Sequence, residues 1–105
     1  MRLPSDEVQV EVLRASLRCF FIPNEEPRRW LPLDIIVSRM QELFPRWRKY
    51  NGGRGINPYW LAEILKTFDL YPSKEYFDGR KRSGYWRDEI YETLKSVLES
   101  EEVRP

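Results

Sequence analysis

The amino-acid sequence predicts a mainly α-helical domain with a small β-hairpin, in the order of a winged helix-turn-helix. Apolar residues recur at helical spacing in four segments. Two of these segments follow one another across a glycine-rich loop, and a basic hairpin comes directly after them. In a winged helix-turn-helix the second helix of such a pair usually enters the DNA major groove, and the hairpin, or wing, contacts the backbone or minor groove.

The first helix is expected from about Ser5 to Phe21. Ser5 can cap it, and Asp6 and Glu7 place negative charge at the positive end of the helix dipole. The apolar stripe of this helix is Val8, Val12, Leu13, Leu17, Phe20 and Phe21. A polar connection, PNEEP, follows it.

A short extended piece and a second helix come next. Trp30-Leu31 is expected to be extended, because the residue before Pro32 is biased away from the helical region. Pro32 suits the first turn of the second helix, and Pro45 ends it. The apolar face of this helix is Leu33, Ile36, Val37, Met40 and Phe44.

The third helix follows the loop RWRKYNGGRG, which covers residues 46–55. Asn57 is expected to cap this helix and Pro58 to occupy its first position. The helix should stop near Asp69. Its buried stripe is expected to be Leu61, Ile64, Leu65 and Phe68.

The hairpin is expected within SKEYFDGRKRSGYW, because aromatic residues flank Asp78-Gly79, a strong two-residue turn signal. Arg87-Asp88-Glu89 opens the final helix. Its apolar face is expected to be Ile90, Tyr91, Leu94, Val97 and Leu98. The charged tail, residues 100–105, is expected to be frayed.

A chain of 105 residues predicts one domain, residues 1–105, with a core at about 5–99. One cysteine, Cys19, and no histidine exclude His/Cys metal sites and Ser-His-Asp triads. Carboxylates alone could still bind Mg²⁺ or act as acid and base, but they form no convergent motif. We therefore expect no enzyme activity, no metal and no cofactor. No apolar run approaches ~18 residues, so a membrane partner is not expected and the cytoplasm is the expected location.

The small net charge of +1 conceals a basic middle. Residues 28–87 carry 13 basic and 6 acidic side chains, whereas residues 1–27 have a net charge of −2 and residues 88–105 one of −4. Such a concentration of cations indicates either a polyanionic partner such as DNA or a solvated surface whose charges cluster by chance.

The clearest cluster lies in the hairpin. Lys74 precedes its turn, Arg80, Lys81 and Arg82 are expected at the turn, and Arg87 follows. Adjacent cations at a hairpin tip serve no core, so we expect contact with nucleic acid there, against the alternative of a plain solvated tip.

The loop before the third helix carries Arg46, Arg48, Lys49 and Arg54, interleaved with Trp47 and Tyr50. These cations could clamp phosphates, helped by amide groups at the helix start, while the aromatic side chains stack on bases or sugars. In the alternative, this is a surface loop whose Trp47 and Tyr50 plug the edge of the core.

The face of the third helix opposite its apolar stripe carries Tyr59, Glu63 and Lys66. Lys66 could reach phosphate or guanine, Glu63 could accept from cytosine N4, and Tyr59 could stack or donate. An ordinary solvent face is the alternative. Trp60, beside them, is expected to be a partly buried packing residue.

The GGRG segment is not expected to bind a nucleotide. A Walker loop needs Lys and then Ser or Thr after its last glycine, but Ile56-Asn57 follow Gly55. A Rossmann fingerprint needs a buried strand before its glycines, and the preceding residues are cationic instead.

Several short motifs occur in sequence over residues 53–85: Gly53-Arg54-Gly55, Leu61-Ala62, Ile64-Leu65-Lys66, Phe68, and Gly84-Tyr85 after a basic hairpin. With the upstream LPLDIIVSRM and PRWRKY, they make residues 8–98 resemble a domain of uncharacterised function found at the C-terminal ends of phage, plasmid and bacterial primase/helicase-type ATPases. The chain departs from that pattern by inserting Trp86 after Gly-Tyr and by having Leu70 where isoleucine is common.

The resemblance implies a winged-helix accessory module of a replication protein, with a primase or helicase ATPase as partner in cis or in trans. It brings no established contact residues. The expected function is DNA binding, to a duplex or a single/double-strand junction, by backbone clamping. The alternative is a protein docking or dimerisation module that uses the acidic final helix and exposed aromatic residues.

Overall fold

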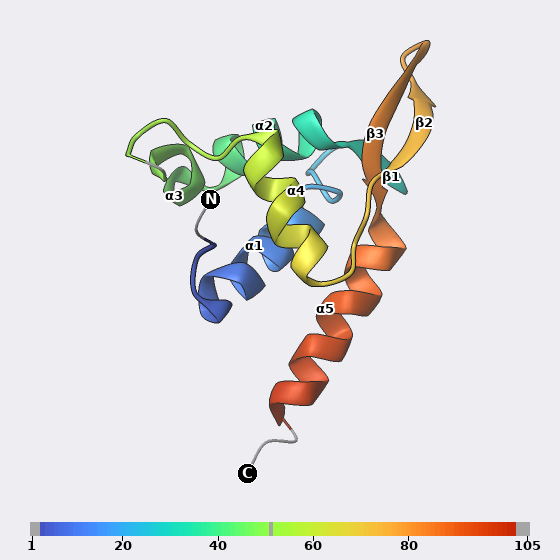
Figure 1. Cartoon of the computed structure of the whole chain (residues 1–105). Helices are drawn as coiled ribbons and strands as arrows, with labels where there is room; N and C mark the ends of the chain where they lie inside the picture. Colours follow the sequence, from blue (N-terminus) through green and yellow to red (C-terminus); the bar gives the residue numbers. More distant parts are fainter. Residues whose placement is uncertain (1–2, 51, 103–105) are drawn as a thin grey trace.

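The structure, a computed structural model, describes residues 3–50 and 52–102 of the chain. This part contains five helices and one three-stranded antiparallel sheet with the strand order β1-β3-β2 (Figure 1). In chain order the elements are α1 (Asp6–Arg18), β1 (Trp30–Pro32), α2 (Leu33–Leu43), α3 (Pro45–Lys49), α4 (Pro58–Thr67), β2 (Ser73–Phe77), β3 (Arg80–Trp86) and α5 (Arg87–Glu102).

Helix α1 begins as expected but ends at Arg18, before the predicted Phe21. The backbone N–H of Cys19 donates to both Ala15 and Ser16, and Phe20 donates to Leu17, so the last turn is tightened and then stops. Phe20 enters the core, whereas Phe21 is exposed and lies under the guanidinium of Arg87. The apolar stripe therefore stops one residue earlier than predicted.

A short helix, α3, replaces the first half of the predicted loop. Phe44 adopts an extended conformation that ends α2, and Pro45 follows at the first position of α3. Trp47 points into the core, with only 3% of its surface exposed. Burial of this side chain explains a helix at a place where local sequence signals indicated a loop.

The predicted extended piece is strand β1, which adds to the two strands of the hairpin. Leu31 of β1 pairs with Tyr85 of β3, and Pro32 pairs with Gly84. A proline is tolerated here because β1 lies at the edge of the sheet. In the hairpin itself, Asp78 and Gly79 both have positive φ, as a two-residue turn requires, so the predicted turn is confirmed.

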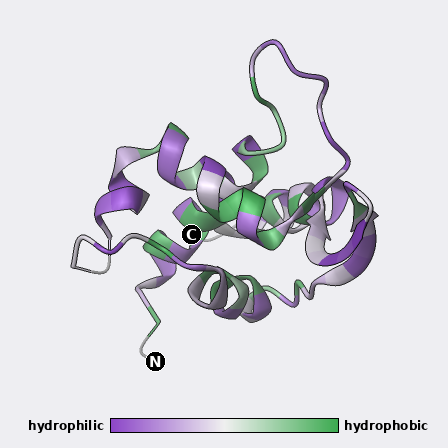
Figure 2. Cartoon of the chain, turned by 90° about the horizontal axis from the view of Figure 1, so that it is seen from above, coloured by the Kyte–Doolittle hydropathy of each residue, from purple (hydrophilic) through white to green (hydrophobic). Residues whose placement is uncertain are grey.

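The core joins apolar residues of α1, α2 and α4 to Leu31 of β1 and Tyr85 of β3, and α2 packs against these two strands. Figure 2 shows hydrophobic residues of the helices gathered toward the middle of the molecule, and a mostly hydrophilic hairpin. Trp60, expected to be partly buried, is almost fully enclosed. The largest side chains that are completely enclosed are Phe20, Leu13, Leu31, Ile36, Met40, Leu61, Ile64, Leu65, Tyr85 and Ile90.

Helix α5 packs along α1 and then extends away from the body (Figure 1). Ile90 is buried and Leu94 and Val97 are partly buried, but Tyr91 is 51% exposed, so the predicted apolar face is narrower than expected. Residues 100–102 continue the helix instead of fraying, and residues 103–105 lie outside the described part. None of the described helices is both long enough and apolar enough to cross a membrane.

Replacing Gly84 by alanine should destabilise the fold by about 2–3 kcal/mol. A Cβ atom at this position would overlap the Leu31 carbonyl oxygen and lie 2.7 Å from Cζ2 of Trp30, so β1 would have to move. Urea unfolding measures the change. Ser83→Ala, at the exposed neighbouring position, is the control, and equal midpoints for the two variants would contradict the close approach of β1 and β3.

Candidate nucleic-acid interface

The hairpin presents one fully exposed face, which we call the hairpin outer face: Lys74, Tyr76, Lys81 and Ser83. The register pairs Tyr76 with Lys81 and Lys74 with Ser83, and paired residues in antiparallel strands share a face. All four are exposed, and Tyr76 is 76% exposed, the most of the large hydrophobic residues described. The result is an aromatic ring between two lysines on a surface with no core to fill.

The opposite face of the hairpin is occupied by contacts within the chain. Arg82 pairs with Asp34 at the start of α2, and its guanidinium lies 5.7 Å from the ring centre of Phe77. Arg28 lies 5.5 Å from the same ring, and the Trp30 ring packs against it at 6.3 Å. Arg82 therefore helps to hold the hairpin against α2.

The three hairpin cations predicted at the turn are in strand β3 instead. Asp78 and Gly79 complete the turn alone, so Arg80, Lys81 and Arg82 alternate between the two faces. Arg80 is exposed beside the turn, Lys81 is on the outer face, and Arg82 is half-buried on the other side. The prediction of a cationic tip is wrong for Arg82, because strand alternation turns its side chain toward α2.

Arg87 lies at the other end of β3, as the first residue of α5. Its guanidinium lies 5.7 Å from the ring centre of Phe21 and 3.3 Å from a carboxylate oxygen of Asp88. Its backbone N–H donates to the carbonyl of Arg29. The structure thus separates Arg87 from the cations near the turn and gives it a packing role.

Three aromatic rings form a cluster behind the α3–α4 connection. The ring centres of Trp47, Tyr50 and Trp60 lie 5.0 to 6.1 Å apart in tilted arrangements. Trp47 and Trp60 are buried and Tyr50 is half-buried. The prediction that Trp47 stacks on a DNA base is therefore wrong. The structure supports the alternative, in which these aromatic residues fill the edge of the core.

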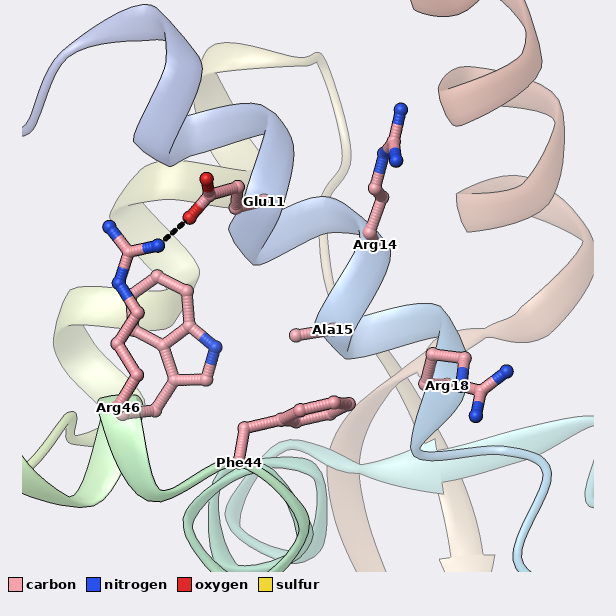
Figure 3. A pocket seen from close by; sticks show the side chains of 7 residues that line it. Glu11, Arg14, Ala15, Arg18, Phe44 and Arg46 are labelled. Atoms are coloured by element: carbon pink, nitrogen blue, oxygen red, sulfur yellow. Dashed lines mark hydrogen bonds and ion pairs between the residues drawn. The ribbon is translucent and has the colours of Figure 1, made fainter.

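Arg46 is also held within the chain. Its guanidinium lies 4.9 Å from the ring centre of Trp47 and pairs with Glu11 of α1 (Figure 3). The other cations of the segment, Arg48, Lys49 and Arg54, are exposed, and none has an ion-pair partner among the described side chains. These three remain available for phosphate.

The glycine-rich connection is fixed to the body by backbone contacts. Gly55 N–H donates to Tyr50, Ile56 N–H donates to Trp47, and the side-chain amide of Gln41 donates to the Ile56 carbonyl. Gly55 has positive φ, and a Cβ there would lie 2.9 Å from the Gln41 amide nitrogen. This glycine thus serves a tight turn against α2.

The start of α4 offers little to a phosphate. Pro58 has no N–H, the Asn57 side chain accepts the N–H of Trp60 at 2.8 Å, and Leu61 donates to the Asn57 carbonyl. The predicted cap is confirmed, but it uses an amide group that the phosphate prediction relied on. Any phosphate contact near this loop depends on the cations.

The residues predicted to read bases on α4 are at least partly accessible to solvent. Tyr59 is 66% exposed, Lys66 is exposed and Glu63 is half-buried. Figure 1 places α4 between α3 on one side and the hairpin on the other. The elements that carry the two groups of exposed cations therefore lie on either side of α4: α3 and its connection to α4 on one side, and the hairpin on the other.

Two buried groups have displaced pKa values, and both belong to the core. Burial raises the pKa of Cys19 to about 12, against a smaller opposing effect of Arg39, and burial raises the pKa of Tyr85 to about 12. Both therefore stay neutral at physiological pH. Among the residues that the structure describes, no cluster of three or more His, Cys, Asp or Glu side chains could hold a metal ion.

Tyr76 is the residue that reasoning from the sequence missed. The signal that could have identified it is the two-residue turn, which fixes the pairing of Tyr76 with Lys81 and hence the face of each side chain. Charge clustering alone drew attention to the adjacent basic residues instead.

No family model matches the chain, and comparisons with curated proteins and with solved structures found nothing similar to it. The likeness to a primase/helicase-associated domain therefore stays a prediction that rests on the short motifs quoted above.

The structure predicts that neighbouring hairpin cations differ in their effect on stability. Arg82→Ala should lower the unfolding free energy by about 1 kcal/mol, because it loses both the Asp34 pair and the Phe77 contact. Lys81→Ala should change it by less than about 0.5 kcal/mol. Urea denaturation compares them, and a Lys81 variant as unstable as the Arg82 variant would show that the assigned faces are wrong.

Proposed function

We propose that the chain is a winged helix-turn-helix domain that binds the DNA backbone as an accessory module of a replicative primase or helicase. The order of α1, β1, α2, α4, β2 and β3, with β1 beside β3, supports this topology. In this assignment α4 is the recognition helix and the hairpin is the wing, while α3 is a short addition between the two helices of the motif.

The hairpin cations carry the proposal. Lys74, Arg80 and Lys81 are exposed on a hairpin that projects from the body (Figure 1), and no carboxylate in the described part of the chain pairs with them. Three unpaired cations on one small hairpin bring no structural benefit, whereas phosphates of a nucleic-acid backbone would neutralise them.

A second set of contacts would come from the far side of α4. Arg48, Lys49 and Arg54 are exposed there, so a DNA segment lying across α4 would meet cations at both ends of its path. The α4 face itself combines a cation, Lys66, with an acid, Glu63, which fits modest base reading between two backbone grips.

The chemistry of this surface is that of binding and not of catalysis. The partner is DNA, in the cytoplasm, and a primase or helicase ATPase supplies the chemical step in cis or in trans. The exposed ring of Tyr76 between Lys74 and Lys81 suits an unpaired base flanked by phosphates, which favours a single/double-strand junction over a plain duplex.

A protein docking or dimerisation module is the second candidate, and one observation favours it. Helix α5 extends beyond the body and is acidic, with Tyr91 half-exposed on its surface. Light scattering over a range of protein concentrations distinguishes the two: a stable dimer without measurable DNA affinity would favour docking.

Reversal of the hairpin charges should weaken DNA binding and flatten its salt dependence. In the triple variant Lys74→Glu, Arg80→Glu and Lys81→Glu, the loss of three phosphate contacts should reduce the slope of log K against log salt by about 2–3. Fluorescence anisotropy with labelled duplex at several salt concentrations measures this.

The control for this variant makes the same change in net charge elsewhere, with Arg14, Arg18 and Lys95 reversed on α1 and α5. It should keep most of the affinity. Equal losses in both triple variants would show that DNA responds to overall charge and not to the hairpin.

Tyr76→Ala should weaken binding to a forked or single-stranded oligonucleotide about 10-fold, within the range of one lost base stack, and change duplex binding little. Tyr76→Phe keeps the ring and should bind like the unaltered protein, while Tyr71→Ala removes another exposed ring as a control. An equal effect of Tyr76→Ala on fork and duplex would argue against stacking on an unpaired base.

A further inference from the structure

A pocket of about 260 Å³ lies between α1 and the junction of α2 with α3 (Figure 3). It is separate from the hairpin outer face, and its residues come from two segments distant in the sequence. The lining residues are Glu11, Arg14, Ala15, Arg18, Phe44, Arg46 and Trp47.

The floor of the pocket is apolar. Figure 3 shows the methyl group of Ala15 and the ring of Phe44 facing the gap between the helices, and Trp47 completes the lining. An apolar cavity of roughly 150 Å³ is enough to hold a benzene ring. The pocket is therefore large enough for one aromatic side chain.

The rim of the pocket is cationic. Arg14 and Arg18 are four residues apart on α1, so they project from the same side of the helix one turn from each other (Figure 3). Both are exposed, and neither has an ion-pair partner among the described side chains. Arg46 is already paired with Glu11. Figure 3 shows the guanidinium groups of Arg14 and Arg18 on the outer side of α1, directed away from Ala15, so these two exposed side chains would rotate about their own bonds to reach a ligand at the rim.

We propose that this pocket binds an acidic peptide segment of a partner protein through one aromatic side chain. The aromatic ring occupies the floor formed by Ala15, Phe44 and Trp47. Carboxylates beside it accept bidentate hydrogen bonds from Arg14 and Arg18, a geometry for which guanidinium is well suited. Removal of the ring from water supplies affinity, and the carboxylates supply orientation and selectivity.

The apolar floor favours a peptide over nucleic acid as the occupant. A phosphate backbone could pair with Arg14 and Arg18 but would leave the apolar floor unfilled. A short acidic segment can instead place its charges beside Arg14 and Arg18 and its ring against the floor, next to the paired side chains of Glu11 and Arg46. The proposal is independent of DNA binding by the hairpin.

The test uses a fluorescein-labelled nine-residue peptide of aspartate and serine with one central phenylalanine, and the same peptide with alanine in its place. Anisotropy at moderate salt should show binding of the phenylalanine peptide and at least 10-fold weaker binding of the alanine peptide. Arg14→Glu with Arg18→Glu should reduce binding at least 10-fold. Ala15→Leu, which fills the floor, should do the same.

The matched control is Arg48→Glu with Lys49→Glu, an equal charge change on α3, and it should leave peptide affinity within about twofold. Thermal melts establish that each variant is folded, and the double arginine variant, altered only at exposed positions, keeps the test valid if Ala15→Leu does not fold.

Three results would overturn the proposal: equal affinity for the two peptides, equal loss in the α3 control, or displacement of the peptide by single-stranded DNA. A dimer that Ala15→Leu dissociates would also overturn it, since the occupant would then be a second copy of the chain.

Discussion

The pairing of β1 with the base of β3 positions the hairpin relative to the helices. Strand β1 has only three residues, but it lies between α1 and α2 in the chain, and its Leu31 is buried beside Tyr85 in the core. Gly84 permits this contact because the Leu31 carbonyl occupies the space of a side chain. The Arg82–Asp34 pair adds a second attachment to α2. Through these contacts the hairpin outer face keeps a defined direction relative to α4.

Local signals in the sequence were sufficient for several elements. Pro58 after Asn57 marked the start of α4, and Asp78-Gly79 marked the hairpin turn, because each feature depends on the conformational preferences of neighbouring residues. Helix α3 and the pairing of β1 with the hairpin could not be predicted in this way. The first depends on the burial of Trp47 against Trp60, and the second on a partner strand far along the chain. Both are consequences of tertiary packing.

The candidate interface was predictable in composition and less so in detail. The distribution of charge along the sequence indicated the basic hairpin and the basic segment before α4. It could not show which cations form ion pairs within the chain and which do not. Arg46 and Arg82 have carboxylate partners 35 and 48 residues away and aromatic partners nearby, and such contacts are visible only in the folded chain. The same holds for the pocket beside α1, because Phe44 and Arg14 come together only when α1 packs against the α2–α3 junction.

The two-residue turn of the hairpin has a consequence for how this sequence tolerates change. With β3 anchored at Gly84, residues at odd offsets from it share one side and residues at even offsets share the other. Exchanging Lys81 and Arg82 would leave the strand pairing, the composition and the net charge unchanged. Inserting one residue between Arg82 and Gly84 would instead exchange the two sides, so that Arg82 would point outward and Lys81 inward. Deletions and insertions in this strand are therefore under a stricter constraint than substitutions of one cation for another.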